Sequence, residues 1–261
     1  MVEISGGNRQ NGKMPFEKPP YFDPARIALF LDVDGTLLDI ALRPDAVHVP
    51  DGLIDTLLRI QALASGALAL VSGRSVAQLD QIFGASHFAA AGCHGAEIRF
   101  LPDGKITRGE SVSTACKARF AALAENFPGV LLEDKGCSLA LHYRAVPELA
   151  PEVLAAAADC IRHFPRMELL PGKAVIELKP AGIDKGSACV EFLRRPPFAD
   201  RTPVYVGDDV TDEWALVRVH ALGGIGISVG GLRRGARYNL KTPAEVRGWL
   251  LMLCKEAVGG I

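Results

Sequence analysis

The chain has 261 residues, of which 49% are hydrophobic and 23% are charged, and its formal net charge is −1 at pH 7. This composition is typical of a globular protein with one large domain or two modest ones. A near-neutral charge gives no field that would attract nucleic acid or an anionic membrane, and no apolar run reaches the roughly 18 residues needed to span a bilayer. We therefore expect neither nucleic acid nor a membrane to be a main partner.

The N-terminal segment lacks the apolar core of a secretory signal and is rich in Gly, Asn, Lys and Pro, which predicts a flexible leader over residues 1–25. The cysteines are widely scattered, with no Cys-x-x-Cys pair, so we expect reduced, structural thiols. Both features favour a cytoplasmic location. The cysteines are Cys93, Cys116, Cys137, Cys160, Cys189 and Cys254.

Short apolar runs, each followed by a turn or a charged residue, recur along the rest of the chain. Several are separated by segments with helical spacing, such as residues 52–64 and 76–83. This alternation predicts a parallel α/β sheet with covering helices. The predicted strands are residues 27–31, 67–71, 87–91, 203–206 and 225–229.

The pattern changes between residues 110 and 180, where helices and strands follow one another in the order α-β-β-α-β-β. This order predicts a small antiparallel sheet backed by helices, inserted into the first domain. The predicted insert, residues 110–180, therefore divides a core formed by residues 26–109 and 181–261. Its predicted elements are helices 111–127 and 147–163 and strands 130–133, 138–143, 167–170 and 174–178.

Polar residues follow the predicted core strands where ligands collect in parallel α/β sheets. Asp32 and Asp34 follow the first strand, Ser72 follows the second, and Asp208 follows a later one. Lys185 begins a predicted helix that re-enters the core. Carboxylates that converge with one lysine and one hydroxyl suit Mg²⁺, and an aspartate in such a group can attack phosphorus. The sequence thus predicts a Mg²⁺-dependent phosphoryl-transfer site.

Four segments, in this order, resemble the motifs of the haloacid dehalogenase (HAD) superfamily of phosphohydrolases: DVDGT (32–36), VSGR (71–74), KG (185–186) and GDDVTDE (207–213). The resemblance implies a doubly wound parallel-sheet core with an inserted α+β cap domain. It implies that Asp32 is the nucleophile, which forms an aspartyl-phosphate. Asp34 would be the general acid and then the general base. Ser72 and Lys185 would hold the phosphoryl group.

The same resemblance implies a Mg²⁺ site formed by Asp32, Asp208 and the backbone carbonyl of Asp34. Asp209 and Asp212, in the last motif, would have auxiliary roles.

Within the superfamily, further segments resemble the trehalose-6-phosphate phosphatases: GCHGAEIR (92–99), EDKGCSLALHYR (133–144) and GKAVIELKPAGIDKG (172–186). This resemblance implies that the insert is a cap that closes over the site and recognises the disaccharide of trehalose 6-phosphate. It also implies functional coupling to a trehalose-6-phosphate synthase. The implied sugar contacts are Glu133, Lys135 and Glu177 in the cap, and Arg74 and His94 in the core.

Strand alternation in KAVIELK supports one of these assignments. It places Lys173, Val175, Glu177 and Lys179 on one face of the strand, and Ala174, Ile176 and Leu178 on the other. The polar face could then meet substrate while the apolar face packs on the cap helices.

Several site residues also have structural interpretations. Ser72 could cap the helix that begins near Ser75, and His94 could be a structural histidine beside a glycine turn. Glu133 and Lys135 could form a solvated pair at a strand end.

The remaining polar candidates are also open to a structural interpretation. His142 and Arg144 could belong to a structural network within the cap. The short Arg-Arg pairs at Arg194 and Arg233 indicate a solvated surface.

Two alternative functions remain at this point. One is a capped phosphatase of the same superfamily that acts on another sugar phosphate, such as sucrose 6-phosphate. The other is a catalytically silent sugar-phosphate sensor or a regulatory domain of a synthase.

Overall fold

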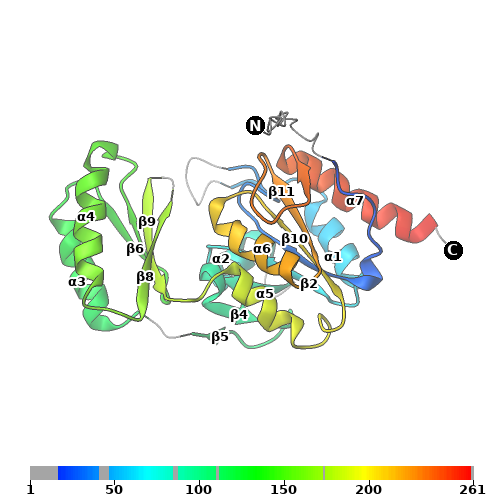
Figure 1. Cartoon of the computed structure of the whole chain (residues 1–261), viewed down its shortest axis with the longest axis horizontal. Helices are drawn as coiled ribbons and strands as arrows, with labels where there is room; N and C mark the ends of the chain where they lie inside the picture. The colour runs from blue at the N-terminus through cyan, green and yellow to red at the C-terminus, as the bar shows by residue number, and fades with distance from the viewer. Residues whose placement is uncertain (1–16, 41–46, 85–87, 110–111, 173, 260–261) are drawn as a thin grey trace, which may run out of the picture.

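The apolar runs of the core form the centre of an eight-stranded sheet in a computed structural model (Figure 1). The structure describes residues 17–40, 47–84, 88–109, 112–172 and 174–259. Strand order is β12-β11-β10-β1-β2-β3-β4-β5; the strands from β12 to β3 are parallel, and β4 and β5 extend one edge antiparallel. The strands are β1 (Ile27–Leu31), β2 (Leu68–Val71), β3 (Ala89–Gly92), β4 (Glu97–Arg99), β5 (Thr107–Arg108), β10 (Thr202–Gly207), β11 (Ile225–Val229) and β12 (Tyr238–Leu240).

Helices cover both faces of this sheet, because its central strands are apolar on both sides. Leu29 and Leu31 of β1 point into one hydrophobic cluster, while Phe30 between them points into the other. The predicted doubly wound α/β core is therefore confirmed. Helices α1 (Leu53–Leu63), α2 (Val76–Phe83) and α7 (Pro243–Gly259) pack on the first face, and α5 (Lys185–Leu193) and α6 (Glu213–Ala221) pack on the second.

The insert, described from residue 112 to residue 180, has its own four-stranded antiparallel sheet (Figure 1). Ile176 and Leu178 pack toward the helices, and Glu177 lies on the opposite face, as the alternation predicted. Lys173, part of that prediction, lies outside the described residues. The strands, in sheet order, are β6 (Leu131–Asp134), β7 (Leu139–His142), β9 (Val175–Pro180) and β8 (Met167–Gly172), and the helices are α3 (Thr114–Glu125) and α4 (Ala150–Ile161).

Residues 17–25 correct the prediction of a flexible leader over residues 1–25. Phe22 lies 6.2 Å, between ring centroids, from both Tyr238 and Trp249. The indole N–H of Trp249 donates a hydrogen bond to the carbonyl oxygen of Pro20 at 3.1 Å. The prediction of flexibility rested on the polar residues and prolines of the segment. The aromatic side chains of the segment are nevertheless stabilised by packing against α7 and β12. Residues 1–16 lie outside the described residues.

The six cysteines are all buried and carry free thiols, as predicted. Among the described helices, none combines the length and the apolar character needed to cross a membrane.

Candidate active site

The residues that the sequence analysis selected come together around one cleft of about 290 Å³. The cleft lies at the carboxyl ends of β1, β2 and β10 and is closed on its other side by the insert. Parallel strands bring their ends to the same edge of a sheet, which explains why segments far apart in the sequence meet here. The selected residues that line it are Asp32, Asp34, Ser72, Arg74, His94, Glu133, Lys135, Glu177, Lys185 and Asp208.

Lys185 is the centre of a buried network at the floor of the cleft. We call this network, which consists of Asp32, Lys185, Tyr205 and Asp212, the core network. The ammonium of Lys185 donates hydrogen bonds to Asp32 Oδ1 and Asp212 Oδ1, both at 2.7 Å. Asp212 is fully buried and also accepts from the Tyr205 hydroxyl at 2.6 Å and from the backbone N–H of Asp208 at 3.0 Å. Asp212 therefore positions both the lysine and the Asp208 loop, which fits an auxiliary role.

The charge of the core network fits a divalent cation. Burial and the charge of Asp212 raise the pKa of Asp32 well above its ordinary value, and the same two causes raise the pKa of Asp208 to about 6. Carboxylate oxygens of these three aspartates lie within 4.8 Å of one another, with the ammonium of Lys185 as their cationic partner. Asp32 Oδ2 is buried and has no hydrogen-bond partner among the described residues. A hard cation such as Mg²⁺ would compensate this excess of negative charge.

Asp212 is a poorer candidate ligand than the other two aspartates. Its Oδ1 accepts from Lys185 and Tyr205, and its Oδ2 accepts from the backbone N–H groups of Asp208 and Asp209. The side chains of Asp32 and Asp208 are therefore the ones best able to hold a metal.

The turn after β1 leaves room for Asp208 only because it contains Gly35. A Cβ at Gly35 would lie 2.2 Å from Asp208 Oδ2, and its φ of +83° is one that glycine adopts without strain. The glycine of DVDGT thus lets the turn approach the carboxylate that follows β10.

Asp34 and Arg74 form a two-pronged ion pair at the mouth of the core site. Arg74 Nε donates to Asp34 Oδ2 at 2.6 Å, and Arg74 Nη2 donates to Asp34 Oδ1 at 2.7 Å. Such paired, charge-assisted bonds fix the orientation of both side chains. The structure thus places Arg74, predicted as a sugar contact, directly on the residue predicted as the general acid.

Ser72 is buried and lines the cleft. Its hydroxyl accepts a hydrogen bond from the backbone N–H of Arg74 at 3.1 Å. The N-cap of α2 is Ser75, which forms a capping box with Gln78. The alternative interpretation of Ser72 as the cap of that helix is therefore wrong.

Glu177 joins the insert to the core through what we call the domain bridge: His94, Glu177 and Lys135. It accepts from Lys135 Nζ at 2.5 Å and pairs with His94 Nε2 at 2.6 Å. Burial would raise the pKa of Glu177, but His94 and Lys135 outweigh that effect and lower it to about 2. His94 thus has a partner from the other domain, and its Nδ1 is buried with no hydrogen-bond partner among the described residues.

Glu133 forms a second contact between the domains. Its Oε2 pairs with His142 Nε2 at 3.0 Å, and its Oε1 accepts from Gln78 Nε2 of α2 at 3.4 Å. The hydrogen bond with His142 lowers the pKa of Glu133. Lys135 bonds to Glu177 and not to Glu133, so the alternative of a solvated Glu133–Lys135 pair is wrong. His142 and Arg144 also line the cleft.

Two residues of the site were missed or misjudged from the sequence. Arg233, interpreted as solvated surface, donates from Nε to the backbone oxygen of Asp208 at 2.8 Å. It follows β11 at the carboxyl edge of the sheet, a position that could have identified it. Gln78 carries no such signal, because it lies within α2, where the sequence pattern identifies only the apolar face of the helix.

Comparisons with known proteins identify the family of the chain. A profile of the trehalose-phosphatase family matches residues 30–241. Over 232 residues the chain is 38% identical to the trehalose-6-phosphate phosphatase of Escherichia coli (strain K12), covering 88% of this chain and 87% of that protein. Over 206 residues it is 43% identical to a probable trehalose-phosphate phosphatase of Sinorhizobium fredii (strain NBRC 101917 / NGR234), covering 78% and 77%.

A solved structure shows the same fold. A haloacid dehalogenase-like hydrolase from Bacteroides thetaiotaomicron superposes with a TM-score of 0.68 at 17% identity, covering 90% of this chain and 100% of that one. The chain thus belongs to the trehalose-phosphatase family and has the fold of HAD-like hydrolases.

Proposed function

We propose that the protein hydrolyses trehalose 6-phosphate to trehalose and phosphate through an aspartyl-phosphate. The observation that carries the proposal is that one cleft combines a buried acid–lysine site from the core with a polar wall from the insert. Family membership supports the same substrate. In this proposal residues 26–109 and 181–261 perform the chemistry, and residues 110–180 act as the cap.

Asp32 is the nucleophile in this mechanism. Its Oδ1 is held by Lys185, and its Oδ2 has no hydrogen-bond partner among the described residues. One oxygen of this carboxylate attacks phosphorus, while the other would hold the cation. A bond forms between the attacking oxygen and phosphorus, and the bond from phosphorus to the sugar oxygen breaks. The ammonium of Lys185 and the hydroxyl of Ser72 hold the phosphoryl oxygens as charge shifts toward the leaving group.

Asp34 moves the protons. As an acid it protonates the leaving sugar oxygen, and as a base it then takes a proton from the water that attacks the aspartyl-phosphate. That second attack releases phosphate and restores Asp32. Because Asp34 is held by Arg74 without substrate, we propose that substrate draws the guanidinium away from one carboxylate oxygen.

Asp32 and Asp208 would hold Mg²⁺, together with the backbone carbonyl of Asp34. When bound, this ion supplies positive charge that stabilises the negative phosphoryl oxygens.

Recognition of the sugar falls to the polar residues between the two domains. Without substrate, Glu133, Lys135, Glu177 and His94 bind other protein groups. Sugar hydroxyls can replace those partners, since they both donate and accept hydrogen bonds. The cleft also shares Arg74 with a neighbouring cavity of about 580 Å³, which offers space for a second sugar ring.

The two alternative functions, a silent sensor and a phosphatase for another sugar phosphate, have less support. A silent sensor has no need for the buried nucleophile and its lysine, which are both in place. Another sugar phosphate would use the same core chemistry, so only the insert separates it from trehalose 6-phosphate. Coupling to a trehalose-6-phosphate synthase and a cytoplasmic location stay predictions.

A panel of sugar phosphates, assayed for phosphate release with and without Mg²⁺, tests the proposal. We expect a preference for trehalose 6-phosphate, loss of activity with a chelator and recovery on adding Mg²⁺. A preference for sucrose 6-phosphate or glucose 6-phosphate would overturn the substrate, and full activity after exhaustive chelation would overturn the metal.

A further inference from the structure

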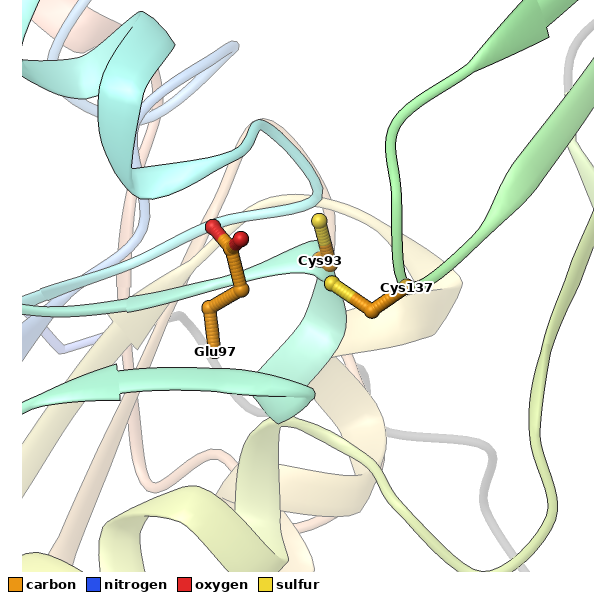
Figure 2. Close-up of side chains that lie close together, drawn as sticks. All are labelled: Cys93, Glu97 and Cys137. Carbon is orange, nitrogen blue, oxygen red and sulfur yellow. The ribbon is translucent and has the colours of Figure 1, made fainter. Parts of the chain in front are cut away.

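A second cluster of reactive side chains lies outside the cleft, where the insert meets the core (Figure 2). One ligand atom from each of Cys93, Glu97 and Cys137 lies within 4.8 Å of the others. Cys93 follows β3 of the core, whereas Cys137 lies in the turn between β6 and β7 of the insert. The two thiols therefore come from different domains.

Both cysteines are buried where the insert meets the core. Cys93 is 0% exposed and Cys137 is 2% exposed, and they form one apolar cluster with Ala96 and Ile183. Cys93 Sγ also lies 3.9 Å from the carbonyl oxygen of Lys135, in the same turn as Cys137. A movement of the insert away from the core would expose both thiols, and its return would bring them together again.

The third member of the cluster, Glu97, argues against a metal site here. One of its oxygens accepts from the backbone N–H of Val76 at 2.8 Å, and the other accepts from Arg108 Nε at 3.0 Å. With both oxygens engaged, only two thiols remain, whereas a structural zinc site takes four ligands. The pair of thiols is left as the reactive feature.

The two thiols differ in acidity. Hydrogen bonding between them lowers the pKa of Cys137 and raises the pKa of Cys93. The thiolate is the reactive form of cysteine, so the lowered pKa of Cys137 favours it as the attacking thiol.

We propose that Cys93 and Cys137 are a redox pair, which forms a reversible disulfide between the insert and the core. The oxidant is a peroxide. The Cys137 thiolate attacks one peroxide oxygen, the O–O bond breaks, and a sulfenic acid forms as the other oxygen leaves as water or an alcohol after gaining a proton. The sulfur of Cys93 then attacks the sulfenic sulfur; the S–S bond forms, and hydroxide leaves as water with the Cys93 proton. Two thiols are oxidised by two electrons, and the peroxide is reduced.

The position of the Cys93–Cys137 pair determines how the disulfide would affect activity. Cys93 is next to His94, and Cys137 is two residues from Lys135, so the crosslink would hold the domain bridge closed. A disaccharide then could not enter or leave. This consequence, which rests on the proposed function, predicts a reversible loss of turnover in the oxidised protein.

The test uses the full chain, treated with hydrogen peroxide, blocked with N-ethylmaleimide and digested without reductant for mass spectrometry. We expect a peptide pair joined through Cys93 and Cys137, at least a tenfold fall in turnover of trehalose 6-phosphate, and recovery with dithiothreitol. Cys93→Ala and Cys137→Ala should each keep basal activity and lose the sensitivity to peroxide. Cys116→Ala is the matched control, because Cys116 is buried within the insert alone, and it should stay sensitive.

Peptide mapping of the wild-type chain decides the chemistry even if a variant folds poorly. Three outcomes would overturn the proposal of a redox pair: absence of the crosslinked peptides, oxidation that is only irreversible, or thiols protected by a tightly bound metal. A crosslinked protein with unchanged turnover would overturn the inference that the disulfide holds the domain bridge closed. If the untreated protein hydrolyses aryl phosphates but not trehalose 6-phosphate, the proposed substrate fails, while the crosslink is still tested by the peptides.

Discussion

The core network and the domain bridge are both buried sets of charged side chains, but they are built differently. Asp32, Lys185 and Asp212 all come from the core, and strand ends and the start of α5 fix them. In the bridge, His94 belongs to the core, whereas Glu177 and Lys135 belong to the insert. A relative movement of the domains would break the bridge and leave the core network intact. Under the proposed function, the chemistry would then be held permanently within the core, while recognition would depend on closure of the insert.

The two sets also differ in charge. The core network has an excess of carboxylates, and the pKa values of its member Asp32 and of the neighbouring Asp208 are raised. The bridge has one carboxylate between a lysine and a histidine, and the pKa of Glu177 is lowered. The core network therefore favours an added cation, whereas the bridge is already satisfied by its own members.

The largest effect is expected at the nucleophile. Asp32→Asn should lower kcat by at least about a thousandfold on every substrate, because an amide cannot attack phosphorus. Phosphate release from trehalose 6-phosphate and from an aryl phosphate measures the effect. Asp51→Asn, at an exposed position, is the control and should change little. A substantial fraction of wild-type activity in Asp32→Asn would break the assignment of chemistry to the core.

Asp212→Ala tests whether the core network is permanent. Removing Asp212 leaves Lys185 with Asp32 as its remaining buried acceptor and takes away the acceptor of the buried Tyr205 hydroxyl, so the free energy of unfolding should fall by about 3 kcal/mol. Lys135→Ala in the bridge should cost less, because opening of the insert lets water reach Glu177. Denaturant titration of both variants measures the difference, and equal losses would contradict the distinction between the two sets.

The main effect of Lys135→Ala should be on substrate selectivity. We expect kcat/KM for trehalose 6-phosphate to fall roughly ten- to a thousandfold, since charged hydrogen bonds to sugar hydroxyls are lost. Hydrolysis of a small aryl phosphate should change little. Lys117→Ala is the matched control, because Lys117 pairs with Asp134 on the surface of the insert.

A parallel loss of both activities in Lys135→Ala would mean that the bridge serves folding or general closure. Equal effects of Lys117→Ala and Lys135→Ala would show that the bridge has no specific role in sugar recognition.

The sequence predicted the elements that carry the core site, because β1, β2 and β10 are continuous apolar runs that end in motif residues. It missed β4, β5 and β12, which have only three, two and three residues. Such short strands have no usable periodicity. In β4 the pattern is further broken by Arg99, which is buried but paired with Asp80 of α2. A buried charge looks like a surface residue until its partner is known.

The members of the site were predictable, but their pairing was not. Motifs identified Asp34, Arg74 and Glu177, and strand order explains why the core residues converge. That Arg74 binds Asp34 depends on how two core loops meet at the strand ends, and that Glu177 binds His94 depends on how the insert sits on the core. Spacing along the chain carries no information about either arrangement. The Cys93–Cys137 pair was hidden for the same reason.

The smallest expected effect is a pH dependence of the bridge. The pKa of Glu177 is lowered from 4.5 to about 2 in the folded protein, so its carboxylate stabilises the fold above about pH 4.5. This contribution is lost as the pH falls toward 2, because the unfolded chain then binds a proton that the folded one does not. From about pH 6 to about pH 4 the loss should be on the order of 1 kcal/mol.

Other carboxylates titrate in the same range, so the measurement must be a difference between two proteins. Glu177→Gln removes the titrating group but keeps the shape of the side chain. The free energy of unfolding of the wild type should exceed that of Glu177→Gln by more at pH 6 than at pH 4, as measured by denaturant titration. A difference that stays constant, or grows as the pH falls, would show that Glu177 is not held as a carboxylate by His94 and Lys135. The bridge would then depend on shape and not on charge, and the contrast with the core network would rest on domain origin alone.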